Sequence, residues 1–101
     1  MTAHIIYNKI DRVNTATHSK KVIQLIRDKI KFTNLIMTDD ISMKSLKQSA
    51  EKNTQKAFSA GCNLVLHCNG NYKELLIVAK NSPILSKFII KKTYQLYKVL
   101  S

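Results

Sequence analysis

The chain has 101 residues, of which 45% are apolar, so it is long enough for one globular domain and too apolar for a disordered chain. Its formal net charge is +11, because 17 Lys and Arg residues stand against only six Asp and Glu. No run approaches the roughly 20 apolar residues of a membrane span, and the N-terminus lacks the basic segment of a signal peptide. We therefore expect a cytoplasmic protein without a membrane partner.

The first third of the chain predicts a strand, a polar connection and a helix. Residues 2–7 are a short apolar run typical of a strand, and residues 8–19 are rich in Asn, Asp and Thr. The helix over residues 20–31 has Ser19 or Thr17 as its candidate N-cap. Its apolar residues recur at three- and four-residue spacing and so line one face, namely Val22, Ile23, Ile26 and Ile30.

The middle of the chain predicts, in order, a strand, a helix and a strand over residues 35–38, 49–60 and 63–68. The first of these strands ends abruptly in Asp39 and Asp40. The helix ends at Gly61, a residue suited to the position after a helix, and Asn69-Gly70 marks a turn. The helix positions expected to be buried are Ala50, Ala57 and Phe58.

Two helices are predicted at the end of the chain, over residues 71–80 and 84–100. Pro83 separates them and suits the first position of the second helix, where its missing N–H group is not needed. One face of this last helix is apolar and carries Leu85, Ile89, Leu96 and Leu100.

Strands that alternate with helices predict an α/β fold with a parallel sheet and right-handed crossovers. The apolar strand residues 35–37 and 64–66 are expected to be buried on both faces of that sheet. Three strands are too few to close a barrel, and the chain offers little to cover them. The sequence therefore reads as the last portion of a larger α/β protein.

The pair Asp39 and Asp40 is the main candidate for chemistry, because a third of the acidic residues of the chain lie here. In α/β folds, functional groups gather where parallel strands end. A carboxylate at that place can be a nucleophile, a general base or a metal ligand. The alternative is that both residues only begin a loop and cap the next helix.

Four ordered segments resemble the C-terminal part of glycoside hydrolase family 3, and most of all its single-domain bacterial β-N-acetylhexosaminidases of peptidoglycan recycling. The resemblance covers essentially the whole chain. The segments are Met1-Thr2-Ala3-His4-Ile5-Ile6-Tyr7 with Ile10-Asp11, then Asn14-Thr15-Ala16-Thr17, then Leu35-Ile36-Met37-Thr38-Asp39-Asp40-Ile41-Ser42-Met43, and finally Ala60-Gly61-Cys62-Asn63-Leu64-Val65-Leu66-His67-Cys68-Asn69-Gly70.

The resemblance implies a fold, a reaction and two site residues. Residues 1–101 would be a partial domain, the C-terminal portion (about three βα units) of a TIM (β/α)8 barrel. The reaction would be retaining hydrolysis of N-acetylglucosamine-containing saccharides, without a cofactor. Asp39, directly after Thr38, matches the catalytic nucleophile of the family, and Asp40 is interpreted as a supporting group. His4 is either a pocket-lining residue that binds substrate or a buried structural histidine.

The sequence departs from the family in one respect. The general acid/base of the family, a His–Asp pair in a Lys-His-Phe-Pro-Gly-His-Gly type segment, has no counterpart in this sequence. Loss of acid catalysis removes roughly 10²–10⁴-fold in rate, so we expect the isolated chain to be inactive. Three hypotheses follow: a fragment of a split or decayed hydrolase, half of a two-piece enzyme with a separately encoded N-terminal barrel segment, or a small basic binding protein without enzymatic activity.

The basic charge does not by itself predict nucleic-acid binding. Binding to phosphates favours basic residues concentrated on one face with Arg and aromatic residues interleaved, whereas here Lys is spread along the chain. The densest cluster, Lys87, Lys91, Lys92 and Lys98, is interpreted as the solvated face of the last helix.

The cysteines are expected to be free thiols. Cys62 and Cys68 are six residues apart on an extended segment, which is about 20 Å, whereas a disulfide needs Cα atoms about 4.4–6.8 Å apart. His67 and Cys68 provide too few ligands for a metal site, so no metal is expected.

Overall fold

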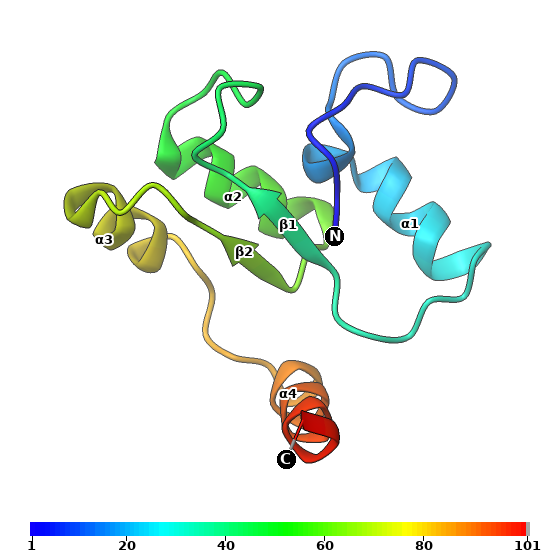
Figure 1. The fold of residues 1–101 in the computed structure, drawn as a ribbon. Helices are drawn as coiled ribbons and strands as arrows, with labels where there is room; N and C mark the ends of the chain where they lie inside the picture. Colours follow the sequence, from blue (N-terminus) through cyan, green and yellow to red (C-terminus); the bar gives the residue numbers. More distant parts are fainter. Residues whose placement is uncertain (101) are drawn as a thin grey trace.

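The computed structural model describes residues 1–100 and places helices around two short parallel strands (Figure 1). In chain order the elements are a 3₁₀ turn (Ala16–His18), α1 (Lys20–Asp28), β1 (Met37–Asp40), α2 (Ala50–Ala60), β2 (Leu64–Leu66), α3 (Tyr72–Lys80) and α4 (Lys87–Leu100). This order confirms the predicted α/β class.

The strand predicted over residues 2–7 is reduced to a single parallel bridge between Thr2 and Thr38. Beyond this bridge the chain turns toward the 3₁₀ turn, where the Ala16 N–H donates to the Ile5 carbonyl over 2.8 Å. The Ile5 carbonyl is thus bound locally and cannot extend a strand ladder. Ile5 and Ile6 are exposed instead.

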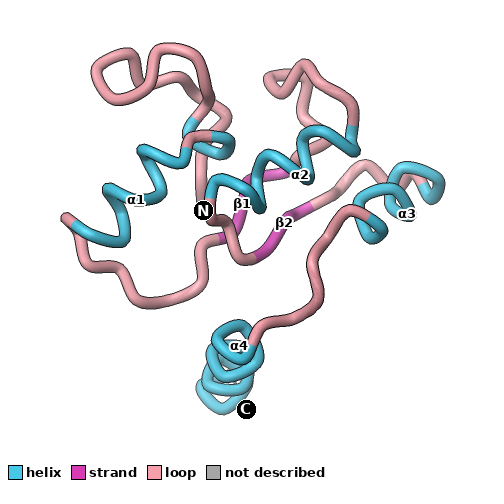
Figure 2. The backbone as a smooth tube through the Cα atoms, turned by 180° about the vertical axis from the view of Figure 1, so that it is seen from behind, coloured by secondary structure: helices cyan, strands magenta, loops and turns pink. Residues whose placement is uncertain are grey.

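The core lies on one face of the sheet, between the strands and helices α1 and α2. Figure 2 shows α2 running across this face. Two clusters of buried side chains meet at Val65, one under α1 and α2 and the other under α3. The first contains Ile23, Ile36, Ala57, Ala60 and Cys62, and the second contains Ile41, Leu46 and Val78. The prediction that the strands are buried on both faces is wrong, since Leu64, Val65 and Leu66 are all only half-buried.

Local capping groups set the ends of several helices as the sequence predicts. The Ser19 hydroxyl accepts the Val22 N–H at the start of α1, which confirms Ser19 rather than Thr17 as N-cap. Gly61 ends α2 in the left-handed region with φ +116°, and its N–H donates to carbonyls of the last turn. Such a left-handed cap satisfies carbonyls that the helix leaves unpaired.

Two predicted helix boundaries differ from the structure. Helix α1 ends at Asp28, so Ile30 lies outside the helix and is 67% exposed rather than part of its buried stripe. Helix α4 begins at Lys87 because the Ser86 hydroxyl accepts the Ile89 N–H, so Pro83 does not start it. On α4 only Ile89 is buried. The other positions of its expected apolar face, Leu85, Leu96 and Leu100, are exposed.

Arg27 ties the end of α1 to three other parts of the chain. Its guanidinium donates to the carbonyls of Phe32 and Asn34 and to Oδ1 of Asn63, over 2.6–2.7 Å. It also lies 5.6 Å from the ring centroid of Phe88 on α4. Because Asn63 Oδ1 also accepts the Ile36 N–H, this contact fixes the chain where both strands begin.

Asp11 organises the polar loop that leads to α1. Its carboxylate accepts the N–H groups of Val13 and Asn14 and the Ser19 hydroxyl, the last over 2.8 Å. The Val13 N–H, followed by the Ser19 hydroxyl and the Asn14 N–H, holds the pKa of the Asp11 carboxyl well below its ordinary value. The loop is therefore built around an ionised carboxylate.

We expect this carboxylate to make stability depend on acid pH. Since the pKa is lower in the folded state than in the unfolded state, its contribution is complete above about pH 5 and falls as the pH drops through the unfolded value of about 3.9. Urea unfolding at pH 7, 5 and 3 measures this, with Asp11→Asn as the comparison. The stability difference between wild type and variant should shrink on acidification, and a constant difference would contradict the assignment.

Cys62 and Cys68 are free thiols, as predicted. Cys62 is buried, and burial raises the pKa of its thiol to about 11. It lies just before β2 and its thiol donates to the Thr17 carbonyl. Among residues 1–100, no helix combines the length and apolar character that crossing a bilayer requires.

Candidate active site

Asp39 lies near the carboxyl end of β1, where the strand leaves the sheet. Its backbone N–H donates to the Thr2 carbonyl over 3.1 Å, and the Thr2 N–H donates to the Met37 carbonyl over 2.8 Å. The N-terminal segment therefore pairs with β1 beside Asp39. The carboxylate is part-exposed, and its Oδ1 accepts the N–H of Asp40 over 2.8 Å. Its other oxygen, Oδ2, has no hydrogen bond to the residues that the structure describes.

The register of the sheet is irregular at this point. Met37 pairs with Leu64 and Asp40 with Leu66, so three steps along β1 match two along β2. The buried hydroxyl of Thr38 accepts the Leu66 N–H over 3.0 Å and satisfies a group that the irregular ladder leaves without a carbonyl. An extra residue of this kind bends a strand and changes the direction of its side chains. It occurs here next to Asp39.

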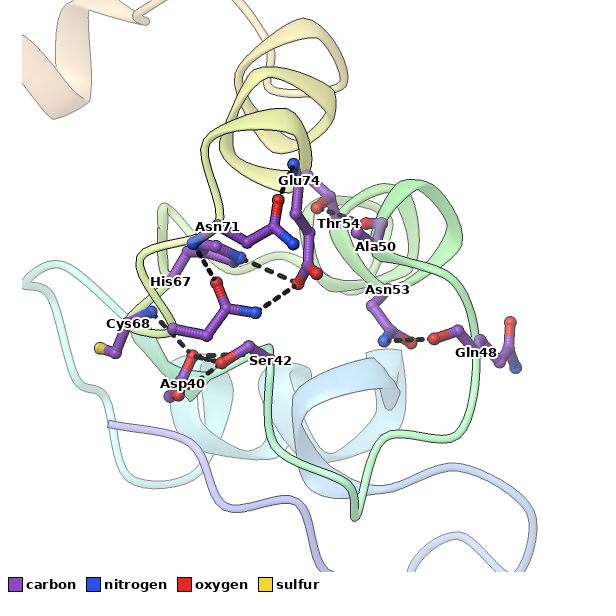
Figure 3. Close-up of polar contacts among 11 residues, drawn as sticks. Asp40, Ser42, Gln48, Ala50, Asn53, Thr54, His67, Cys68, Asn71 and Glu74 are labelled. Atoms are coloured by element: carbon purple, nitrogen blue, oxygen red, sulfur yellow. Dashed lines mark hydrogen bonds and ion pairs between the residues drawn. The ribbon is translucent and has the colours of Figure 1, made fainter.

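The carboxylate of Asp40, the last residue of β1, is hydrogen-bonded to the backbone just after β2 and so connects the ends of the two strands (Figure 3). Its carboxylate accepts the Ser42 N–H and hydroxyl and the Cys68 N–H, over 2.7–3.0 Å. Burial raises the pKa of this carboxyl, but the hydrogen bonds from Ser42 and Cys68 and the nearby His67 outweigh burial and lower it. Asp40 is thus an ionised structural group, which agrees with its interpretation as a supporting residue.

His4 is buried and contacts the backbone carbonyl of Asp40, the residue after Asp39. Its Nε2 lies 2.8 Å from the Asp40 carbonyl, and because a carbonyl can only accept, Nε2 carries the proton. Its Nδ1 lies 2.8 Å from the hydroxyl of Thr17, which is fully buried and also contacts Thr2. Both ring nitrogens therefore contact protein groups. Its role as a pocket-lining residue stays a prediction.

A second polar group anchors the start of α3 beside the end of β2 (Figure 3). The Nε2 of His67 lies 2.9 Å from Oε1 of Glu74, which also accepts the Asn69 amide. Asn71 caps α3 by accepting the Glu74 N–H. Among residues 1–100, no group of three or more His, Cys, Asp and Glu side chains is placed to hold a metal ion.

The structure brings together both residues that the sequence singles out. Asp39 and His4 are 35 positions apart in the sequence, and His4 contacts the carbonyl of Asp40, the residue directly after Asp39. Sequence reasoning missed Thr2, which bonds to Thr17, and assigned Thr17 only as a possible helix cap. The available signal was that both belong to the segments that carry the family resemblance.

Comparison with known proteins identifies the family. The chain matches the model of the glycosyl hydrolase family 3 N-terminal domain over residues 1–99. The chain belongs to glycoside hydrolase family 3. It is 35% identical over 71 residues to a β-hexosaminidase of Nitrosomonas eutropha, and 31% identical over 90 residues to one of Haemophilus influenzae.

A solved structure is also similar to this chain. The crystal structure of CbsA from Thermotoga neapolitana is 32% identical and superposes with a TM-score of 0.68, over 80% of this chain and 18% of that one. The match to the Nitrosomonas relative includes 68% of this chain but only 20% of the relative. The match to the Haemophilus relative includes 82% of this chain and 26% of the relative, so the chain spans about a quarter or less of the length of these proteins. The resemblance seen in the four sequence segments is confirmed.

Proposed function

We propose that this chain carries the catalytic nucleophile, Asp39, of a retaining β-N-acetylhexosaminidase, and that it forms the C-terminal βα units of a (β/α)8 barrel. The observation that carries the proposal is the position of Asp39 near the carboxyl end of β1, in a family 3 chain similar to β-hexosaminidases. In barrel enzymes, catalytic residues come from the carboxyl ends of the strands.

In the proposed reaction, a carboxylate oxygen of Asp39 attacks the anomeric carbon of an N-acetylglucosamine residue. The glycosidic C–O bond breaks, and the leaving-group oxygen takes a proton from a general acid. Water then attacks the covalent glycosyl-enzyme, giving up a proton to the same group as base, and Asp39 is released as a carboxylate. Retention follows from the two displacements.

Three features of this chain prepare Asp39 for that role. The ladder irregularity beside Thr38 sets the local direction of the strand. His4 holds the Asp40 carbonyl, and the Asp40 carboxylate ties β1 to the Cys68 N–H. The irregularity at Thr38 precedes the nucleophile and both contacts of Asp40 follow it, so we assign His4 and Asp40 as positioning groups rather than catalytic residues.

The general acid/base and the remaining strands would come from an N-terminal barrel segment that these 101 residues do not contain. The His–Asp segment of the family has no counterpart in this sequence. The proposed partner is a separately encoded N-terminal barrel segment. Apolar side chains left exposed on the N-terminal segment and on α3 are candidates for burial against it: Ile5, Ile6, Tyr7, Leu75 and Leu76.

Complementation tests this proposal. The probe is a β-hexosaminidase of Haemophilus influenzae from which the region matched by this chain has been deleted. We expect each piece alone to leave an aryl β-N-acetylglucosaminide intact, and the two co-expressed pieces to co-purify and hydrolyse it. Robust turnover by the lone chain would show that it holds its own acid/base. A co-purified pair without turnover would contradict the assigned function.

A further inference from the structure

Helix α4 stands apart from the α/β part of the molecule, at the end of the non-helical segment 81–86 (Figure 1). It contacts the rest of the chain through buried Ile89 and through the Phe88 ring over Arg27. The side of α4 away from these contacts carries Ile90, Tyr94 and Tyr97, which are 55%, 62% and 74% exposed. Their three- and four-residue spacing makes them one continuous stripe.

A row of lysines borders this stripe. Lys87, Lys91 and Lys98 recur at four- and seven-residue spacing, and the Lys98 ammonium lies 5.2 Å from the Tyr94 ring centroid. No Asp or Glu follows Glu74 anywhere in the sequence. Neither α4 nor the segment before it therefore contains an Asp or Glu side chain that could offset the charge of Lys87 and Lys91.

We propose that α4 binds the surface of anionic lipid bilayers, with its Ile90–Tyr94–Tyr97 stripe in the headgroup boundary and its lysines on the anionic headgroups. Helices that lie in a membrane interface combine an apolar face with Lys-rich flanks. Tyrosine suits this depth because its ring is apolar and its hydroxyl is polar. This proposal is independent of the glycosidase function. It replaces the expectation of no membrane partner, which rested on the lack of a membrane span, because a helix of this length lies on a bilayer rather than spanning it.

Two other occupants fit the face less well. Nucleic acid would pair with the lysines but would leave Ile90, and the exposed Ile84 and Leu85 of the preceding segment, in water. A second copy of the chain would bring two lysine rows together without any acidic residue between them. An anionic lipid surface satisfies both the apolar stripe and the charge.

The full chain allows a direct test, because it contains no tryptophan. Tyr97→Trp places a single fluorophore at an exposed position of the stripe. We expect its emission to shift to the blue with vesicles of phosphatidylcholine and phosphatidylglycerol in equal parts, and the chain to sediment with them. Pure phosphatidylcholine vesicles should produce a much smaller effect, and added salt should weaken binding to the anionic ones.

Substitutions test the contribution of the lysines separately from that of the apolar stripe. In the Tyr97→Trp background, Lys87→Gln with Lys91→Gln should lower the vesicle partition coefficient by roughly fivefold for each lysine removed. Ile90→Asp should lower it with every lysine kept. The matched control, Lys20→Gln with Lys21→Gln, changes exposed lysines of α1 and should leave partitioning unchanged.

Circular dichroism of each variant checks that its helices are retained. The proposal is overturned if the emission of the fluorophore does not change when anionic vesicles are added. It is also overturned if replacing the two α4 lysines and replacing the two α1 lysines lower the vesicle partition coefficient equally. It is equally overturned if the blue shift appears with a DNA duplex, or with the complementing hexosaminidase piece, and not with vesicles.

Discussion

Replacing Asp39 by Asn is expected to lower kcat of the complemented enzyme by on the order of 10⁴-fold or more, the scale of losing a catalytic nucleophile. The amide has the shape of the carboxylate but cannot form the glycosyl-enzyme. Because Asp39 is part-exposed and its Oδ1 accepts only the Asp40 N–H, the substitution should leave folding intact. Hydrolysis of an aryl β-N-acetylglucosaminide measures the loss.

Two further measurements make the Asp39 prediction specific. Asp28→Asn changes an exposed acid at the end of α1 and should leave the rate unchanged. With Asp39→Ala, added azide should attack the anomeric carbon in place of the carboxylate. The product should then be a glycosyl azide of inverted configuration, since only one displacement remains. Full activity in Asp39→Asn, or retained configuration in the azide product, would remove Asp39 from the nucleophile role.

Gly61→Ala is expected to destabilise the fold by about 2–4 kcal/mol, through backbone strain and overpacking together. Gly61 has φ +116°, a conformation that L-residues rarely adopt. A Cβ atom at this position would lie 2.8 Å from Cγ2 of Ile23, which is buried in the core cluster under α1 and α2. Since small domains are marginally stable, the variant should be largely unfolded or have a much lower urea midpoint.

Gly70→Ala provides the matched control for Gly61. Gly70 also has positive φ, +72°, but a Cβ there would meet nothing within 4 Å. Its cost should be limited to the left-handed backbone, about 1–2 kcal/mol. Urea unfolding followed by circular dichroism compares the two variants with wild type. Equal losses would mean that the contact with Ile23 contributes nothing to the effect of Gly61.

Errors in the predicted elements have physical causes that composition does not reveal. The apolar run at residues 2–7 reads as a strand, but the Ile5 carbonyl bonds to Ala16 and only Thr2 joins β1. Pro83 suits the start of a helix, yet the Ser86 hydroxyl caps α4 three residues later. In both cases two local patterns compete, and the hydrogen bonds made in the folded chain choose between them.

The sequence alone determined the features that depend on neighbouring residues. The α/β order, the cap at Ser19, the end of α2 at Gly61 and the family segments around Asp39 can all be read from the sequence. Capping hydrogen bonds join groups only two to four positions apart, so a short stretch of sequence contains both the donor and the acceptor.

Only the tertiary structure decided how Asp39 is held. The contact of His4 with the Asp40 carbonyl joins residues 36 positions apart, and that of the Asp40 carboxylate with the Cys68 N–H joins residues 28 apart. The strand irregularity beside Thr38 likewise exists only once β1 and β2 pair. Such contacts depend on the register of one strand against another, and strand pairing is fixed by packing of the whole chain rather than by any local run of residues.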